Sequence, residues 1–207
     1  SHGSALAYQP DVSVFFAHPR ELTPADFTDL AALAGPGGLV GLRDRRGDLP
    51  AGWDVLEVFD LVQYTGEHVA AVADPELVRL SDDDVPEMTA LIEETKPGPF
   101  LPRTIELGDY LGYRDPATGQ LLAMAGERAK PDGWTEISAV CTRPAARGRG
   151  LARRLISAVA AGIVARGDLP FLHTTADNPA CALYEDMGFV HRSTLPLELV
   201  RVPERTP

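Results

Sequence analysis

One strand–turn–helix segment, residues 134–166, constrains the fold of this chain more than any other stretch. It begins with WTEISAVCT (Trp134–Thr142), an apolar and β-prone run that predicts a strand. A turn with two glycines follows, and a helix is predicted from about Gly148 to Arg166. Every fourth residue of this helix is aliphatic, so one face of it must be buried. That stripe consists of Leu151, Leu155, Val159 and Ile163.

The sequence around this segment alternates between short strand-like and helix-like runs. Turns rich in Gly, Pro and Asp separate three successive strands before the long helix, which predicts an antiparallel meander. The predicted strands are Leu77–Leu80, Tyr110–Arg114, Leu121–Arg128, Trp134–Thr142, Leu169–Thr175, Phe189–Ser193 and Leu195–Val200. The predicted helices are Val85–Glu94, Leu101–Leu107, Gly148–Arg166 and one that Asp177-Asn178-Pro179 begins and Gly188 ends.

The first 76 residues are predicted to form a separate N-terminal α/β lobe, with the boundary near Ala73-Asp74-Pro75 and a second domain over residues 77–207. The start, Ser1–Ser4, has no methionine, and we expect it to be a tag remnant. The elements expected in the lobe are strands at Val12–Ala17, Leu39–Leu42 and Asp54–Tyr64 and a helix from Thr23-Pro24 to Ala34.

Composition excludes several classes of function. The net charge of −11 argues against nucleic-acid binding, because phosphate contacts dominate that affinity. No run approaches the eighteen apolar residues of a membrane span, so no membrane partner is expected. The two cysteines, Cys141 and Cys181, lack metal-ligand spacing, which predicts reduced thiols in a cytoplasmic protein without a metal.

A local basic patch stands out within this acidic chain. Residues 137–167 contain six arginines and no acidic residue. The first turn of a helix leaves N–H groups unpaired, and glycines let an anionic ligand approach them closely. Arg147, Arg149 and Arg153 would add charge-assisted hydrogen bonds, whereas Arg143 and Arg154 are not required and are expected to be solvated. No P-loop lysine or dinucleotide βαβ unit is present, so the patch favours a small phosphate-bearing ligand.

Two stretches resemble the signatures of the GNAT superfamily of acyl-CoA-dependent N-acyltransferases. RGRGLA (Arg147–Ala152) is similar to the Arg/Gln-x-x-Gly-x-Gly/Ala signature, and NPACALYEDMGF, which starts at Asn178, is similar to the second one. PGPFLPRTIELGDYLG and PFLHTTADNPA also look like the glycine N-acyltransferase-like branch. The resemblance covers about Leu77–Val202. It implies the GNAT-type fold, an α/β (α+β) architecture with a mixed, mostly antiparallel sheet flanked by helices.

The resemblance also implies a function, an acetyl transfer from acetyl-CoA to an amine by direct attack in a ternary complex. The pyrophosphate would lie on the backbone of Arg147–Ala152, and the pantetheine would pair with the strand near Val140. Tyr184 would protonate the leaving thiolate. The residues expected to bind the cofactor are Val140, Cys141, Thr142, Arg147, Gly148, Arg149, Gly150, Leu151, Ala152, Arg153 and Asn178.

A base must take up the amine proton, since an amine with a pKa of about 10 is mostly protonated at neutral pH. Glu136 is predicted to be this catalytic base. It shares a strand face with Val140, but four residues span about 13 Å, so it would act through water. Glu127 on the neighbouring strand is the alternative candidate. His173, in the middle of a strand, is expected to be a packed histidine.

The acceptor is not readable from the sequence. Phe100 and Arg103 lie in the loop expected to bind it, where Arg103 would hold a substrate carboxylate. Expected partners are a small-molecule amine or a peptide amine, and a second copy of the chain in a homodimer. An alternative function is a non-catalytic acyl-CoA-binding module that serves sensing or assembly.

Overall fold

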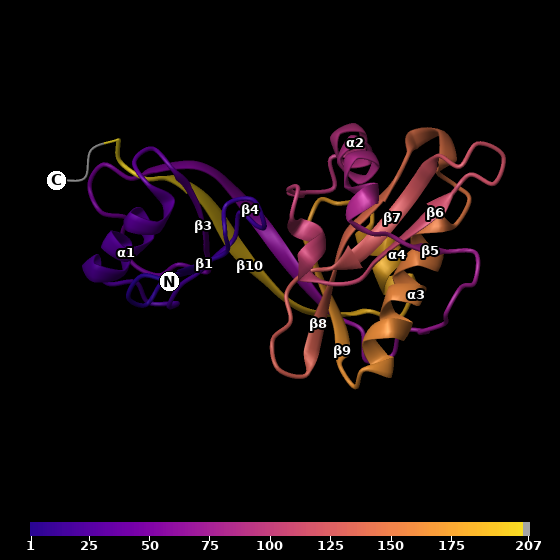
Figure 1. Cartoon of the computed structure of the whole chain (residues 1–207). Coiled ribbons are helices and arrows are strands. Elements are labelled where there is room, and N and C mark those ends of the chain that lie inside the picture. Colours follow the sequence, from indigo (N-terminus) through magenta and orange to yellow (C-terminus); the bar gives the residue numbers. More distant parts are fainter. Residues whose placement is uncertain (205–207) are drawn as a thin grey trace. The chain divides into compact units, whose positions relative to one another are not determined.

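The computed structural model describes residues 1–204 and divides the chain into two compact units (Figure 1). The first unit consists of residues 1–62 and the chain from Thr194 onward, and the second consists of residues 63–193. The predicted division after residue 76 differs from this arrangement. Residues 63–76 belong to the second unit, and the C-terminal strand returns to the first one.

The first unit is built around one helix, α1, which runs from Pro24 to Ala34 as predicted. The Thr23 side chain accepts a hydrogen bond from the Asp26 N–H while the Asp26 carboxylate accepts from Thr23, so a capping box starts the helix. The predicted strand at Val12–Ala17 is wrong over most of its length, since only its last two residues pair. The strands are β1 (Leu6–Ala7), β2 (Phe16–Ala17), β3 (Leu39–Arg43) and parts of β4 (Asp54–Thr65) and β10 (Val190–Arg201).

The second unit contains the strand–turn–helix segment on which the fold prediction rested. Its further strands are β5 (Val78–Arg79), β6 (Tyr110–Arg114), β7 (Leu121–Glu127), β8 (Trp134–Thr142) and β9 (Leu169–Thr175). Its helices are α2 (Val85–Thr95), α3 (Leu151–Ala165) and α4 (Cys181–Asp186), with 3₁₀ turns η1 (Asp82–Asp84), η2 (Thr104–Leu107) and η3 (Pro144–Ala146).

Hydrogen bonds connect the strands in the order β3-β10-β4-β9-β8-β7-β6-β5. The run from β5 to β8 is an antiparallel meander, and β8 and β9 are parallel. The helix α3 packs on β6 to β9, and α2 packs on β7 and β8. All four residues of the predicted aliphatic stripe of α3 are buried. The predicted class, a mixed and mostly antiparallel sheet flanked by helices, is confirmed.

Several predicted boundaries move for local reasons. The helix α3 begins at Leu151 rather than Gly148, because Gly148 and Gly150 have φ values of 78° and 73°, outside the right-handed helical region. The helix after Asn178 begins only at Cys181. The two strands predicted after Phe189 are a single strand, β10, and the helix predicted at Leu101–Leu107 is the short turn η2.

No helix among the described residues is both long enough and apolar enough to cross a lipid bilayer.

Candidate functional site

The strands β8 and β9 part halfway along their length. Their parallel pairing starts at Trp134 and Leu169 and ends at Ile137 and Leu172, although both strands continue for several residues (Figure 1). Ala139 lies just beyond this point with φ of 53°, and the register between β7 and β8 shifts there. Such a β-bulge turns the strand away from its neighbour. The last residues of β8 therefore have backbone groups on the β9 side that no registered strand pair uses.

The loop that follows β8 presents a row of unpaired N–H groups. Within the described residues, no acceptor contacts the backbone N–H groups from Gly148 to Arg153. A Cβ added at Gly148 or Gly150 would meet no atom within 4 Å, so the space next to these groups is open. Glycine is favoured at both positions because a left-handed φ disfavours any residue with a side chain. The partial positive charge of the α3 N-terminus adds to this arrangement, which suits an anion.

The five arginines of this region have different partners. Arg143 donates from Nε to the Leu121 carbonyl at 2.8 Å and pairs with Glu94, and Arg153 pairs with Asp186. Among the described residues, Arg147 and Arg149 have no carboxylate partner. The uncompensated positive charge therefore lies directly on the glycine-bearing loop.

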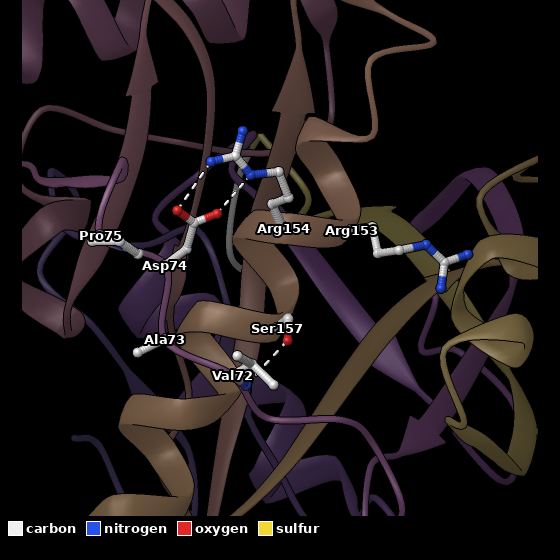
Figure 2. A pocket seen from close by; sticks show the side chains of 7 residues that line it. All are labelled: Val72, Ala73, Asp74, Pro75, Arg153, Arg154 and Ser157. Atoms are coloured by element: carbon white, nitrogen blue, oxygen red, sulfur yellow. Dashed lines mark hydrogen bonds and ion pairs between the residues drawn. The ribbon is translucent and has the colours of Figure 1, made fainter.

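Arg154 is held by two acidic residues from the segment that precedes β5. Its Nε and Nη2 atoms donate to the two Asp74 carboxylate oxygens at 2.6 and 3.0 Å (Figure 2). Nη2 also donates to Glu76 at 2.7 Å. The Arg154 guanidinium holds the pKa of Asp74 below its ordinary value. The prediction that Arg143 and Arg154 are solvated is thus wrong, because both form ion pairs.

A pocket of about 260 Å³ lies beside this ion pair. The Val72 N–H donates to the Ser157 hydroxyl at 3.1 Å, which ties the segment to α3 (Figure 2). Arg153 points away from the Asp74–Arg154 pair (Figure 2). Because Asp74 neutralises Arg154, the pocket has little free positive charge. It is lined by Val72, Ala73, Asp74, Pro75, Arg153, Arg154 and Ser157.

Tyr184 on α4 is a buried phenol in an aromatic cluster. Its ring centroid lies 6.0 Å from those of Tyr64 and Phe189. Burial, with a contribution from Cys181, raises the pKa of Tyr184 to about 12. The hydroxyl therefore stays protonated through the neutral range, which is the state a proton donor needs.

Asn178 is fixed by two hydrogen bonds at the end of β9. Its Nδ2 donates to the Thr174 hydroxyl at 2.8 Å, and its Oδ1 accepts from the Ala180 N–H at 2.9 Å. This arrangement orders the turn into α4.

Glu136 on β8 is part of a buried charged network. Its side chain is 2% exposed, and Arg128 donates to its two carboxylate oxygens at 2.6 and 2.8 Å. The Nδ1 atom of His173 lies 2.7 Å from Oε1 of the same carboxylate. Burial alone would raise the pKa of Glu136, but Arg128 and His173 outweigh it and lower this pKa to about 2.

Comparison with known proteins identifies the family. The FR47-like protein family matches residues 110–196. An acetyltransferase from the GNAT family of Novosphingobium aromaticivorans is 37% identical, and the match covers 100% of this chain and 91% of that one with a TM-score of 0.86. The chain belongs to the GNAT family of acetyltransferases.

More distant structures share the fold. A GCN5-related N-acetyltransferase from Kribbella flavida is 19% identical, with a TM-score of 0.61 over 97% of this chain and 88% of that one. A GNAT-family acetyltransferase from Colwellia psychrerythraea is 14% identical, with a TM-score of 0.58 over 78% and 64%. No match was found among curated proteins.

Glu127, the alternative base candidate in this GNAT chain, is also sequestered. Its side chain is 1% exposed, Lys130 lies 2.9 Å from it, and Arg166 forms a second ion pair. The carboxylate thus ties the end of β7 to the end of α3. A role for Glu127 as the base stays a prediction.

The predicted acceptor residues occupy different environments. Phe100 is 8% exposed and packs edge-on against Tyr110, with ring centroids 5.7 Å apart. Arg103 is half-exposed and donates to both oxygens of Glu106 at 2.6 and 2.8 Å, so a substrate carboxylate would compete with that pair. An acceptor role for either residue stays a prediction. Cys141 is buried and its pKa is raised to about 11 by burial, which leaves it a protonated core thiol.

Sequence reasoning missed the residues that contact Glu136 from other strands. His173 was expected only to be packed, yet one face of its ring contacts a charged network. Gln63 on β4 lies with Nε2 2.9 Å from Nε2 of His173, and its Oε1 accepts from Arg192 at 3.0 Å. The two-residue alternation places His173 on the same face as Phe171, the registered partner of Glu136, and this signal is visible in the sequence only once the strand pairing is known.

Proposed function

We propose that this chain is an acetyl-CoA-dependent N-acetyltransferase that acts by direct attack of an amine in a ternary complex. The observation that carries the proposal is the glycine-bearing loop before α3, with unpaired N–H groups from Gly148 to Arg153 and free charge at Arg147 and Arg149. A diphosphate needs such a row of donors at a helix N-terminus. Membership of the GNAT family supports the acetyl transfer.

The separation of β8 and β9 leaves a strand edge along which the rest of the cofactor would bind. The pantetheine arm would extend along Val140, Cys141 and Thr142, on the side where β8 has no registered partner. An extended chain with amide groups can bind such an edge as an added strand would. Asn178, in the turn after β9, would donate to the arm with the Nδ2 hydrogen that Thr174 does not use. Leu151 and Ala152 contribute backbone N–H groups to the pyrophosphate site.

The chemistry follows from these positions. The amine nitrogen attacks the thioester carbonyl, and a backbone N–H near Val140 stabilises the oxygen that becomes negative. The C–S bond then breaks, and the Tyr184 phenol gives its proton to the departing thiolate. A phenol that is protonated up to a pKa of about 12 is available over the whole neutral range. The acceptor is an amine, either of a small molecule or of a peptide.

The test is release of free thiol from acetyl-CoA across a panel of amines, polyamines, amino acids and peptides, together with calorimetric binding of acetyl-CoA alone. We expect binding without an acceptor and thiol release with at least one amine. Binding without turnover on the whole panel would contradict the transfer and favour a sensing or assembly module. No binding of acetyl-CoA would contradict the site.

A further inference from the structure

We propose that His173, rather than Glu136, takes the proton from the acceptor amine, and that Glu136 is a positioning residue which holds the imidazole. This inference rests on the proposed function and names the group that completes its chemistry. It also gives Gln63 a role. In the free protein the Gln63 amide occupies the position from which an acceptor amine would donate to His173.

Glu136 has no free oxygen at the surface. Arg128 donates to both of its oxygens, and the side chain is 2% exposed. A carboxylate in this setting accepts a proton only in strong acid. The His173 side chain is 11% exposed, so of the two groups it is the one that reaches the solvent side.

Hydrogen bonds determine which ring nitrogen of His173 has a lone pair. An ionised carboxylate only accepts, so the 2.7 Å contact with Glu136 requires the proton on Nδ1. Arg192 only donates, so the Gln63 oxygen faces Arg192 and the Gln63 amide nitrogen faces His173. That amide donates to Nε2 at 2.9 Å, so Nε2 has a lone pair and the imidazole is neutral. This is the protonation state of a base.

His173 also lies at the point where β8 and β9 separate. The last registered pair of β8 and β9 is Ile137 with Leu172, and His173 is the next residue of β9. The side chain thus lies where the strands begin to part, on the same face as Glu136. The opening is where the thioester of the proposed cofactor would extend along β8.

The Gln63 amide donates to Nε2 of His173 as the acceptor amine would. A neutral N–H group approaches Nε2 at the distance that an amine nitrogen needs for proton transfer, about 2.6 to 3.2 Å. Displacement of this amide by the acceptor would cost one hydrogen bond and return another of similar strength. The site would then select an N–H donor over a ligand that can only accept.

The charged groups that face His173 come from several elements. Glu136 approaches from β8, Arg128 lies behind it after β7, and Arg192 on β10 reaches the ring through Gln63 on β4. On its own strand the neighbour is the Phe171 ring, at 5.5 Å between centroids.

His173 and Tyr184 each transfer one proton during the reaction. The amine nitrogen forms a bond to the carbonyl carbon, and one of its protons moves to Nε2 of His173. The C–S bond breaks, and the thiolate leaves with the proton of Tyr184. His173 then returns its proton to solvent and Tyr184 regains one, so the net products are an amide and a thiol.

The test combines kinetics and spectroscopy on the full chain. With the best amine of the panel, His173→Gln should lower kcat/KM by roughly a hundredfold or more and remove the acidic limb of its pH profile. Glu136→Gln should lower kcat with KM little changed and should alter the His173 tautomer seen by nitrogen-15 NMR, because the carboxylate that accepts from Nδ1 is gone. His68→Gln, an exposed histidine outside the network, is the matched control and should behave like the wild type.

Two further measurements keep the outcomes separate. Calorimetry with acetyl-CoA reports whether each variant is folded and binds the donor. Nitrogen-15 NMR of the wild-type imidazoles at pH 7.5 should show His173 as the Nδ1–H tautomer; an Nε2–H tautomer would overturn the proposal without any variant. If the His173→Gln variant has the turnover and the pH profile of the wild type, the role of His173 is overturned and the proposed function stays intact. A wild type that transfers to no amine would overturn both.

Discussion

The replacement of Gly150 by alanine separates the conformational role of the loop from its proposed role in binding. Gly150 precedes α3 with φ of 73°, and an added Cβ would touch no atom within 4 Å. Gly119, in the turn between β6 and β7, has nearly the same φ of 75° and equally open surroundings. The two glycines are therefore matched in φ and in the space beside them, and only Gly150 lies at the proposed pyrophosphate site.

The expected loss of stability is small and equal at both positions. A residue with a side chain in the left-handed region costs about 1 kcal/mol relative to glycine. For a chain of this size, that corresponds to a fall in the melting temperature of roughly 3 °C. No steric term is added in either case, because neither Cβ meets a neighbour.

The expected loss of binding differs between them. A methyl group at Gly150 would occupy the open space that a pyrophosphate needs to reach the N–H groups of the α3 N-terminus. Loss of even one charge-assisted hydrogen bond of about 1.4 kcal/mol raises the dissociation constant of acetyl-CoA tenfold. We expect at least this change for Gly150→Ala and an unchanged constant for Gly119→Ala, both measured by calorimetry. Equal affinities in the two variants would refute the assignment of the loop.

Three other predictions follow from the charges and phenols of the second unit. Tyr184→Phe should lower turnover with the acetyl-CoA dissociation constant unchanged, as a steady-state and calorimetric comparison would show; equal turnover would remove the phenol from the reaction. Arg149→Ala should weaken acetyl-CoA about tenfold and reduce the salt dependence of binding, whereas Arg143→Ala, which loses the contacts with Glu94 and Leu121, should lower the melting temperature instead. The folded-state pKa of Glu136 is about 2, below its ordinary value of 4.5, so it stabilises the fold above pH 4.5 and that contribution, roughly 3 kcal/mol, is lost as the pH falls towards 2. Acid unfolding of Glu136→Gln should lack this component, and an unchanged pH dependence would contradict the network.

Local patterns predicted those parts of the fold that neighbouring residues determine. The strands β6, β8 and β9 have the predicted bounds, because each is an apolar run closed by turn residues. The face of α3 was predictable from its four-residue repeat. The starting residue of α3 was not, because the sequence does not show that the two glycines adopt left-handed φ values instead of the first helical turn.

Such local patterns could not predict which strands pair when they are far apart in the sequence. The C-terminal strand is continuous from Val190 to Arg201, and its second half pairs with β3 from the other end of the chain, so no local boundary signal could assign it to the first unit. The same limit applies to the candidate site. Glu136 was singled out for its residue type and strand face, but its pKa depends on Arg128 and His173, which the fold brings to it. The carboxylate predicted from the sequence to be the base is hydrogen-bonded to both of these residues in the structure.

The charge available from the arginines before and within α3 also depends on partners that only the fold brings to them. In the sequence they form one basic cluster, from which Arg147, Arg149 and Arg153 were predicted to bind the phosphate. In the fold, acidic side chains from α2, α4 and the segment before β5 pair with three of the five, which leaves free charge at Arg147 and Arg149. These two flank Gly148, whose N–H group is itself unpaired among the described residues. An acidic chain can thus present a localised anion site, because its carboxylates neutralise the arginines around the loop and leave the loop itself positive.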